Sequence, residues 1–346
     1  PVAGFDVQLS IDLDIQQYAE QALETELRNS RNLAEDETAA DRAPYNGLDP
    51  KTNFETRIFR QKLPDGTLID YPQFVQHKAP AGAVVVLDHT NGQVTAMASY
   101  PTFDNRWMDS GITGSKYKEL FPAFKADGVT PIDPDESILV NRAVQGNYNL
   151  GSTIKPFISW AALHAGIITA NTIFFDEGTY ELQTIPTENC QNNGGLVRCI
   201  FKNATNRLGK PSSYGEVTVE DALAVSSDAF FYKIGEEMWL ASENIPGAAE
   251  QENPENLLKT NLERFGFGNK TGIQLPFEWK GRIPDDEVKR DLVERGVLLP
   301  GETPRLLVGD NVQVSIGQGL MAATPMQSAN AYATIANGGL LLQPSI

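Results

Sequence analysis

The chain has 346 residues, 41% of them hydrophobic, which is enough to bury the core of one large domain or two ordinary ones. Its 28 Lys and Arg against 45 Asp and Glu give a net charge of -17, which disfavours binding to nucleic acids or to anionic membrane surfaces. No window reaches the roughly 18 apolar residues of a spanning helix, and the chain begins at Pro1 without an initiator Met. We therefore expect residues 1–346 to be a fragment of a longer protein, with any membrane anchor upstream.

The first residues predict a strand that leads into a helix. Val7, Leu9 and Ile11 alternate with polar residues, as in a half-buried strand. Asp12 or Asp14 then caps a helix whose apolar residues keep helical spacing. The chain is therefore expected to open with a strand followed by a helix.

A polar stretch separates this helix from the clearest β pattern in the chain. Residues 30–78 are acidic, polar and proline-containing, with weak periodicity, and predict an insertion or a small subdomain. Two strands, 84–88 and 93–98, then flank Asn91-Gly92, which is the pattern of a hairpin closed by an Asn-Gly turn. Because the first strand is continuously apolar, we expect it to be covered on both faces, in a central sheet with helices packed against it.

Three apolar helices are predicted further along the chain. The first begins at Gly151, and the second runs from about Val219 to Trp239 with a Ser-Ser-Asp step near its middle. The third begins after Thr324-Pro325, a cap followed by a first-turn proline, and ends at Asn337-Gly338-Gly339. An antiparallel sheet flanked by several long helices predicts a mixed α+β fold class.

The only cysteines, Cys190 and Cys199, lie in a polar loop, residues 186–210, that can fold back on itself. The sequence leaves two interpretations open, a local disulfide and two free thiols. Two thiols cannot supply the four ligands of a structural zinc site, and no His lies in residues 191–198. No metal and no cofactor is therefore predicted.

Ser152 and Lys155 form the first pattern with chemical meaning. A serine attacks an acyl carbon only if a base takes its proton, and a neutral lysine one helical turn away can do so. The spacing places both side chains on one face of a helix, whose N-terminus favours an oxyanion and a neutral lysine. The residues alone leave open a simpler interpretation, in which Ser152 is a helix cap and Lys155 a surface lysine with a partly buried stem.

Ser115-Lys116-Tyr117-Lys118 has the same serine-to-lysine spacing in another part of the chain. It lies in a Gly-, Lys- and Asp-rich stretch with no apolar helix behind it. We therefore expect Ser115 to be a solvated loop residue without a catalytic role.

Ser226 and Asp228 interrupt the second apolar helix with polar groups. Buried hydroxyls and carboxylates are costly without hydrogen bonds, so these residues either cap one another at a kink or face a cleft. A Ser-Lys helix about seventy residues earlier favours the cleft.

The motifs S-x-x-K at Ser152 and S-x-D at Ser226 resemble those of the penicillin-binding protein and serine β-lactamase superfamily. Flanking segments narrow the resemblance to class B penicillin-binding proteins. These segments are Asn141 to Gly146 before Gly151 to Pro156, Phe265 to Gly268 with Thr271 to Pro276, and Ser315 to Gly319 with Thr324-Pro325. The Gln-Gly forms at Gln145 and Gln318 look more like the elongation branch, penicillin-binding protein 2, than the septal branch.

The resemblance implies a transpeptidase fold and a serine acyl-enzyme mechanism on the stem peptides of peptidoglycan. Ser152 attacks the penultimate D-Ala carbonyl, and Lys155 takes its proton. Ser226 passes a proton to the departing amine, while Asp228 orients Lys155 and binds a substrate amide. The backbone N–H of Ser152 supplies half of the oxyanion hole.

The same resemblance implies substrate contacts by Ser227 and Tyr148. It implies β-lactam antibiotics as further ligands, a membrane glycosyltransferase of the elongation machinery as partner, and the extracytoplasmic face of the bacterial membrane as location. Two other functions stay open. One is a β-lactamase or β-lactam sensor of the same superfamily, and the other is a catalytically degenerate cell-wall scaffold.

Three features depart from the family pattern. Asn149-Leu150 stands where the family usually has a proline, and the second motif ends in Asp228 rather than Asn. Lys270-Thr271-Gly272 matches the family's third motif, yet it lacks strand alternation and precedes the Ser315 segment, so we expect Lys270 in a loop. The catalytic triplet is then expected beyond Ile346, and the chain by itself is expected to be weakly active or inactive.

Overall fold

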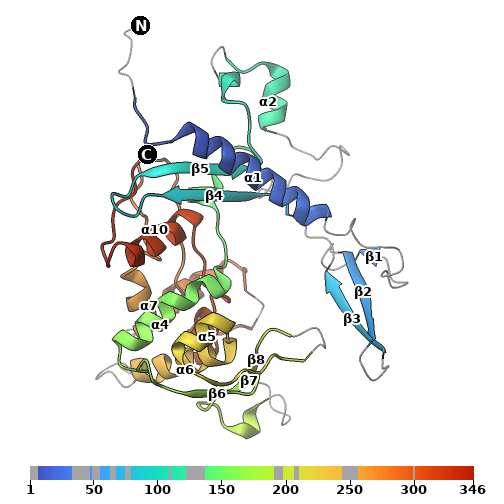
Figure 1. Cartoon of the computed structure of the whole chain (residues 1–346), viewed down its shortest axis with the longest axis vertical. Coiled ribbons are helices and arrows are strands. Elements are labelled where there is room, and N and C mark those ends of the chain that lie inside the picture. Colours follow the sequence, from blue (N-terminus) through green and yellow to red (C-terminus); the bar gives the residue numbers. More distant parts are fainter. Residues whose placement is uncertain are drawn as a thin grey trace. The chain divides into compact units, whose positions relative to one another are not determined.

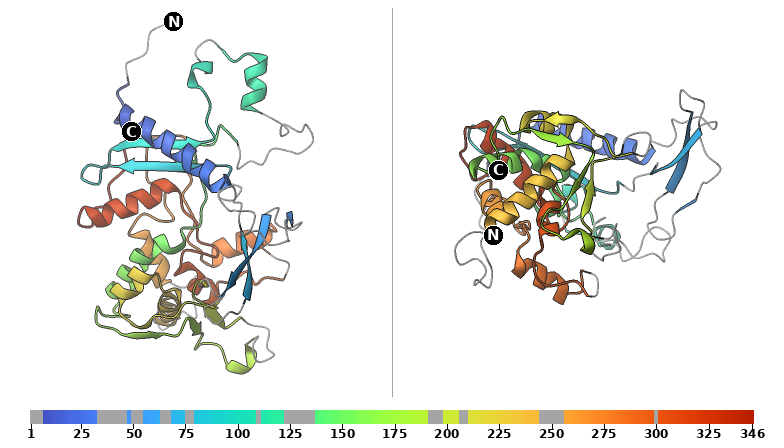
Figure 2. Two further views of the ribbon diagram at one scale, coloured as in Figure 1. Left: turned by 45° about the vertical axis from the view of Figure 1, so that its right-hand side comes forward. Right: turned by 90° about the horizontal axis from the view of Figure 1, so that it is seen from below.

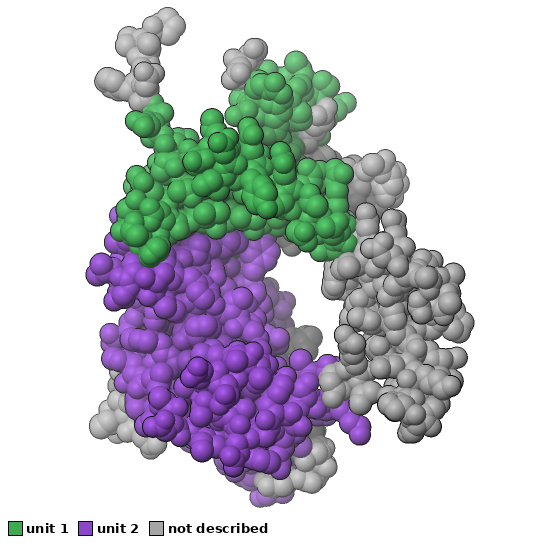
Figure 3. All heavy atoms as spheres, viewed as in Figure 1, with its two compact units in different colours: residues 1–146, 273–277, 344–346 green, residues 147–272, 278–343 purple. Residues whose placement is uncertain are grey.

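The structure is a computed structural model that describes residues 7–32, 47–48, 55–62, 68–74, 79–108, 111–121, 137–190, 198–205, 210–243, 256–298 and 301–346. The chain divides into two compact units (Figure 3). Unit 1 comprises residues 1–146, 273–277 and 344–346, and unit 2 comprises residues 147–272 and 278–343. None of the helices in the described ranges combines the length and the hydrophobicity of a membrane span.

The described part of unit 1 contains helices and two antiparallel sheets (Figure 1). Its elements are α1 (Leu13–Asn32), β1 (Gly47–Leu48), β2 (Glu55–Lys62), β3 (Leu68–Phe74), β4 (Gly82–Leu87), β5 (Val94–Tyr100), the 3-10 turn η1 (Asn105–Met108), α2 (Gly114–Leu120) and α3 (Arg142–Gln145). One sheet has the order β1-β2-β3, and the other pairs β4 with β5. The first sheet lies within residues 30–78, and the assignment of that stretch as an insertion or subdomain stays a prediction.

Helix α1 lies along the β4–β5 hairpin (Figures 1 and 2). Asp12 caps it as predicted, because Asp12 Oδ1 accepts the backbone N–H groups of Asp14 and Ile15 at 3.0 and 3.1 Å. The Gln16 side chain then fixes the helix to β5, since it donates to the Met97 carbonyl and accepts from the Met97 N–H. The predicted first helix is confirmed.

The strand predicted at residues 7–11 is wrong. These residues are irregular, and Val7 is 80% exposed. The backbone groups at the start of β5 have another partner, because Ser345 accepts from the Val94 N–H and donates to the Gly92 carbonyl. The segment meets β5 only locally, where the Ser10 hydroxyl donates to the Val94 carbonyl and the Asp12 N–H to the Thr95 carbonyl, and it forms no strand ladder.

The hairpin predicted around Asn91-Gly92 is confirmed. Gly92 has φ 78°, a left-handed conformation that suits glycine, and β4 and β5 pair in antiparallel register. Alternate residues of β5 are buried, namely Val94, Ala96 and Ala98. β4 is only half-buried, with Val86 37% exposed, so the expectation that this strand is covered on both faces is wrong.

Unit 2 contains most of the helices and two short antiparallel strand pairs in its described residues (Figure 1). Its elements are the 3-10 turn η3 (Gly151–Ile154), α4 (Lys155–His164), β6 (Phe174–Asp176), β7 (Thr179–Glu181), η4 (Thr187–Asn189), β8 (Ile200–Lys202), β9 (Gly215–Val217), α5 (Val219–Val225), α6 (Asp228–Glu243), α7 (Leu257–Glu263), α8 (Asp286–Glu294), α9 (Val308–Val314) and α10 (Pro325–Ala336). β6 pairs with β9, and β7 pairs with β8.

Aromatic rings fill the core beside α4. The fully buried ring of Phe157 meets the rings of Phe265, Phe267 and Tyr332 edge-on, with centroids 5.0 to 5.2 Å apart. Edge-to-face pairs of this kind add to the free energy gained by burying the rings. The helix that follows Ser152 is therefore anchored by one of its largest side chains.

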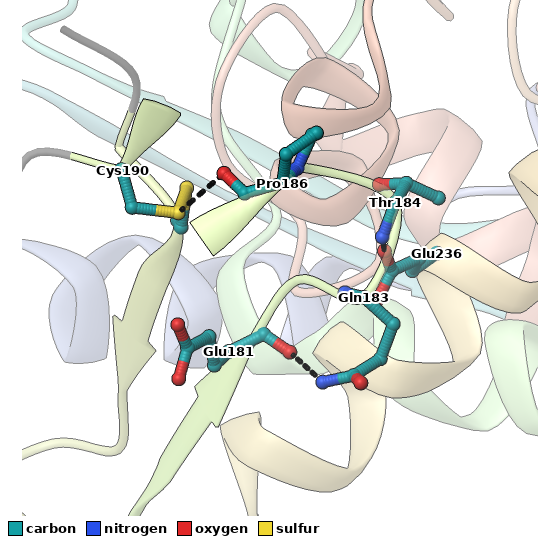
Figure 4. The surroundings of a disulfide bond; sticks show 7 residues. Glu181, Gln183, Thr184, Pro186, Cys190 and Glu236 are labelled. Atoms are coloured by element: carbon teal, nitrogen blue, oxygen red, sulfur yellow. Dashed lines mark hydrogen bonds between the residues drawn. A yellow bond between two sulfur atoms is a disulfide. The ribbon is translucent and has the colours of Figure 1, made fainter. Parts of the chain in front are cut away.

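The cysteine loop is closed by a disulfide between Cys190 and Cys199, which confirms one of the two interpretations of the sequence (Figure 4). Glu236 of α6 holds the chain that leads into this loop. Its buried carboxylate accepts the Tyr180 hydroxyl at 2.7 Å and the Thr184 backbone N–H at 2.7 Å. The chain is therefore fixed to α6 shortly before it reaches the disulfide.

Two of the predicted helices differ in detail from the structure. The segment from Gly151 begins as a 3-10 turn, and the α-helix proper starts at Lys155, where Pro156 fits the first turn because its missing N–H has no helical partner there. The helix predicted from Val219 to Trp239 is two helices, because Ser226 adopts a left-handed conformation that ends α5.

The third predicted helix is confirmed as α10. Thr324 and Gln327 form a reciprocal capping box at its start, and Asn337 ends it. Helices combined with antiparallel strand pairs make the fold class mixed α+β, as predicted.

The Phe157 cluster predicts a large difference between two phenylalanine substitutions. Phe157→Ala removes a fully buried ring and should lower the free energy of unfolding by about 3–5 kcal/mol. Phe175→Ala is the matched control, since Phe175 is 62% exposed and its loss should cost within about 0.5 kcal/mol. Denaturant unfolding of both variants measures the difference, and equal costs would contradict this description of the core.

Candidate active site

Ser152 lies in the 3-10 turn η3, one turn before Lys155 at the start of α4. A 3-10 helix has about three residues per turn, so side chains three positions apart lie over one another. Ser152 is exposed, whereas Lys155 is 1% exposed. The burial predicted for Lys155 is confirmed, and the interpretation of Lys155 as a surface lysine is wrong.

Two glycines hold the turn that presents Ser152. The Gly151 N–H donates to the Gly317 carbonyl at 2.9 Å, and the two residues have φ 55° and 70°. A Cβ on Gly317 would lie 2.6 Å from the Gly151 nitrogen and would overlap its carbonyl oxygen. In the sequence, Gly317 stands out only as part of the Ser315 to Gly319 segment, and nothing in that pattern shows which residue it faces.

Tyr332 of α10 fixes the residue on the other side of Ser152. Its hydroxyl donates to the Thr153 carbonyl at 2.8 Å, and its ring packs against Phe157. Partial burial raises the pKa of Tyr332, so its hydroxyl keeps its proton and remains a donor at neutral pH. Both neighbours of Ser152 are therefore held by bonds to other segments of unit 2.

Lys155 Nζ donates to three oxygen atoms at the junction of α5 and α6. The acceptors are the Ser226 carbonyl at 2.9 Å, Ser226 Oγ at 3.0 Å and Asp228 Oδ1 at 2.6 Å, and the Phe231 ring lies 5.3 Å away. Burial lowers the pKa of Lys155, and Asp228 offsets part of this effect because its carboxylate favours the ammonium form. Lys155 therefore loses its proton at a lower pH than an exposed lysine.

Ser226 connects the lysine to the exposed serine. It has φ 57° and ψ 45°, and this left-handed conformation turns the chain out of α5. Ser226 Oγ donates to Ser152 Oγ at 2.9 Å and accepts from Lys155 Nζ at 3.0 Å. A continuous hydrogen-bond path thus joins an accessible hydroxyl to a buried amine, which is an arrangement suited to nucleophilic attack on an acyl carbon.

The two residues expected to bind substrate lie in different environments. Ser227 is fully buried, and its hydroxyl donates to Asp176 at 2.5 Å and accepts from the Phe230 N–H at 3.1 Å. This placement argues against a substrate contact by the Ser227 side chain and makes it the N-cap of α6. Tyr148 is 39% exposed, and its backbone pairs with Ala323. Its predicted substrate contact stays a prediction.

Lys270 lies in a loop, as predicted, and lines a cavity of about 360 Å³ that does not include Ser152 or Lys155 in its lining. Ser115 is exposed, as predicted, but it lies in the short helix α2 rather than in a loop, because Thr113 caps that helix by accepting from the Lys116 N–H. In the described residues, no group of three or more His, Cys, Asp or Glu side chains is placed to hold a metal ion.

Comparison with known families identifies the family to which the chain belongs. Residues 82–346 match the model of the penicillin binding protein transpeptidase domain, which is most of the chain. The chain belongs to this transpeptidase family. The match begins after residues 30–78, so the stretch assigned as an insertion lies outside the segment that the family model covers.

Curated relatives of the transpeptidase family also match more than two thirds of the chain. Peptidoglycan D,D-transpeptidase MrdA of Haemophilus influenzae is 32% identical over 267 residues, which cover 77% of this chain and 33% of that protein. MrdA of Escherichia coli is 31% identical over 264 residues, and peptidoglycan D,D-transpeptidase FtsI of the same organism is 26% identical over 270 residues. The chain spans about a third of the length of these relatives.

Solved structures of the transpeptidase family share the fold. Penicillin-binding protein 2 of Pseudomonas aeruginosa, in complex with WCK 5153, aligns with TM-score 0.57 and 28% identity, over 77% of this chain and 48% of that one. A chain of a peptidoglycan synthase complex aligns with TM-score 0.64 and 26% identity, over 99% of this chain and 43% of that one. Penicillin-binding protein 2 of Helicobacter pylori, in complex with MreC, aligns with TM-score 0.56 at 22% identity.

The contact between Gly317 and Gly151 predicts opposite effects for two glycine substitutions. Gly317→Ala should lower the free energy of unfolding by about 1–3 kcal/mol, because the added Cβ displaces the backbone before Ser152. Gly309→Ala is the control, since open space surrounds this helical glycine and alanine there should stabilise the protein by about 0.4–1 kcal/mol. Denaturant unfolding tests both values, and a neutral Gly317→Ala would show that the two segments do not touch.

Proposed function

We propose that the chain is the catalytic part of an elongation-type peptidoglycan D,D-transpeptidase with Ser152 as its nucleophile. The observation that carries this proposal is the hydrogen-bond path from exposed Ser152 through Ser226 to buried Lys155, in a member of the transpeptidase family. The relatives at 31 and 32% identity are named peptidoglycan D,D-transpeptidase MrdA, whereas FtsI matches at 26%, which favours the elongation branch over the septal one.

In the proposed reaction, Ser152 Oγ attacks the penultimate D-Ala carbonyl of a donor stem peptide. Its proton passes to neutral Lys155 through the Ser226 hydroxyl, which lies within hydrogen-bond distance of both groups and rotates to accept from Ser152 and donate to the neutral amine. The Ser152 N–H stabilises the oxyanion, and the terminal D-Ala leaves with a proton delivered by Ser226. An amine of a neighbouring stem peptide then attacks the acyl ester, which forms the cross-link and frees Ser152.

Asp228 has the role of holding Lys155 and Ser226 in this arrangement. It is the first residue of α6 and directly follows the turn at Ser226. Its Oδ1 accepts from Lys155 Nζ at 2.6 Å. The aspartate in the place of the more usual asparagine therefore provides an acceptor and adds a negative charge beside the lysine.

The same proposal includes the substrate, the inhibitors, the partner protein and the cellular location. Peptidoglycan stem peptides are the substrate, and β-lactams acylate Ser152. The partner is a membrane glycosyltransferase, since one structural match is a chain of a peptidoglycan synthase complex. The disulfide between Cys190 and Cys199 favours an oxidising compartment, which fits the extracytoplasmic face of the bacterial membrane.

Benzylpenicillin tests whether Ser152 is the nucleophile. In the full-length protein, mass spectrometry after treatment should show one stable adduct on Ser152. Ser152→Ala should lose the adduct. Ser115→Ala should keep it, because Ser115 has the same spacing to a lysine but lies exposed on α2. An unmodified wild-type protein would identify a degenerate scaffold, and an adduct that is rapidly hydrolysed would identify a β-lactamase.

Asp228→Asn should move the pH dependence of acylation to lower pH. Acylation requires neutral Lys155, so its rate rises as the pH passes the pKa of Lys155. Burial lowers the pKa of Lys155, and Asp228 raises it. Without the carboxylate the ammonium form is less stable, so the neutral amine forms at lower pH.

The control for this shift is Asp291→Asn, which removes an equal charge from an exposed ion pair with Arg295. The rate of penicillin acylation, measured across the acidic to alkaline range, should keep the wild-type midpoint in Asp291→Asn. A midpoint for Asp228→Asn that stays in place or moves to higher pH would rule out the proposed action of Asp228 on Lys155.

A further inference from the structure

A buried polar network lies behind the turn that carries Ser226 and Asp228. Asp176, at the end of β6, is 1% exposed, and Asn203, directly after β8, is 4% exposed. Asn203 Nδ2 donates to both carboxylate oxygens of Asp176 at 3.0 Å. Asp176 also accepts the Gly178 N–H at 2.6 Å and the Ser227 hydroxyl at 2.5 Å. These hydrogen bonds replace the water that the buried carboxylate loses.

The network bonds to the chain on both sides of Asp228. Ser227 precedes Asp228, and its hydroxyl is held by Asp176. Ala229 follows Asp228, and its N–H donates to Asn203 Oδ1 at 2.7 Å. The first-turn N–H groups of α6 thus find their acceptors in Asn203 and Ser227. Ser226 and Asp228 contact Lys155, and the backbone that carries them is held by the bonds from Asp176 to Ser227 and from Asn203 to Ala229.

The left-handed conformation of Ser226 needs such support. For a residue other than glycine it costs on the order of 1–3 kcal/mol and persists only where the surroundings over-determine it. The bonds of Ser226 itself within the described residues run to the Ala222 and Leu223 carbonyls, to Ser152 and to Lys155. The side-chain network therefore acts through the residues next to Ser226.

We propose that Asp176 and Asn203 are positioning residues for acyl transfer, which set the geometry of Ser226 and Asp228 around Lys155 without touching the substrate. This inference rests on the proposed function of Ser152. Nothing in the sequence marks the two residues, since they lie 27 positions apart and neither belongs to a motif. Their role follows from the strand pairing that brings the end of β6 and the end of β8 to the start of α6.

The test compares two buried asparagines that both bond to the backbone of α6. Asn203 accepts from its first turn at Ala229, and Asn311 of α9 donates to the Gly235 carbonyl farther along the helix at 2.8 Å. Asn203→Ala and Asn311→Ala therefore remove similar groups, but only Asn203 bonds to the backbone next to Ser226 and Asp228. Stopped-flow acylation of the full-length protein by penicillin gives the rate at saturation and the half-saturating concentration.

Asn203→Ala should lower the saturating acylation rate by about 100-fold, the order expected when reacting groups shift by about 1 Å, and leave the half-saturating concentration unchanged. Among the described residues, Asp228 is the charged group that contacts Lys155. If Asp228 is held less firmly, it raises the pKa of Lys155 less. The midpoint of the pH dependence of acylation in Asn203→Ala should therefore also move to lower pH. Asn311→Ala should keep both the wild-type rate and the wild-type pH profile, whatever stability it loses.

Ser227→Ala keeps the inference testable if Asn203→Ala does not fold. It removes a single hydroxyl between Asp176 and α6, and should slow acylation in the same way. Rates and pH profiles of Asn203→Ala and Ser227→Ala that match those of Asn311→Ala would overturn the inference and show a merely structural network. A wild-type protein that forms no adduct at Ser152 would instead refute the proposed function.

Discussion

The buried ammonium group of Lys155 is the interaction on which the rest of the site depends. Moving such a group out of water is costly unless hydrogen bonds and an opposite charge replace the lost solvent. Here the acceptors come from a short stretch, the carbonyl and hydroxyl of Ser226 and the carboxylate of Asp228. The chain must therefore bring several oxygens of adjacent residues to one point, which a continuous helix does not do.

The break between α5 and α6 solves this geometric problem. A left-handed residue at Ser226 turns its own carbonyl and hydroxyl toward Lys155, and the new helix begins at once with Asp228. Ser152 needs a similar departure from regular structure, since it follows a glycine with positive φ that touches Gly317. Both catalytic candidates thus stand on irregular backbone that more rigid elements of unit 2 hold in place.

The sequence predicts the elements whose signals are local. The cap and proline of α10, the Asn-Gly hairpin and the burial of Lys155 all follow from residues within one turn or one hairpin. The failures have a different origin. The strand at residues 7–11 has the right alternation, but Ser345 holds the edge at the start of β5, and no local pattern reveals such competition between distant segments.

The same limit applies to the candidate site. The motifs identify Ser152, Lys155, Ser226 and Asp228 as candidate site residues. These residues are joined by hydrogen bonds in the structure. Ser227 lies between two of them and was expected beside the substrate, yet its buried hydroxyl donates to Asp176, which lies 51 positions earlier in the chain. Contacts with residues far away in the chain, such as Gly317, Asp176 and Asn203, become visible only once the fold is known.

The pairing of β7 with β8 fixes the position of Asn203 independently of the residues between the two strands. Thr179 stands opposite Lys202, so the chain leaves and returns at neighbouring points whatever lies between them. Additions or deletions between Glu181 and Ile200 can therefore accumulate over evolution without changing the strand register that positions Asn203.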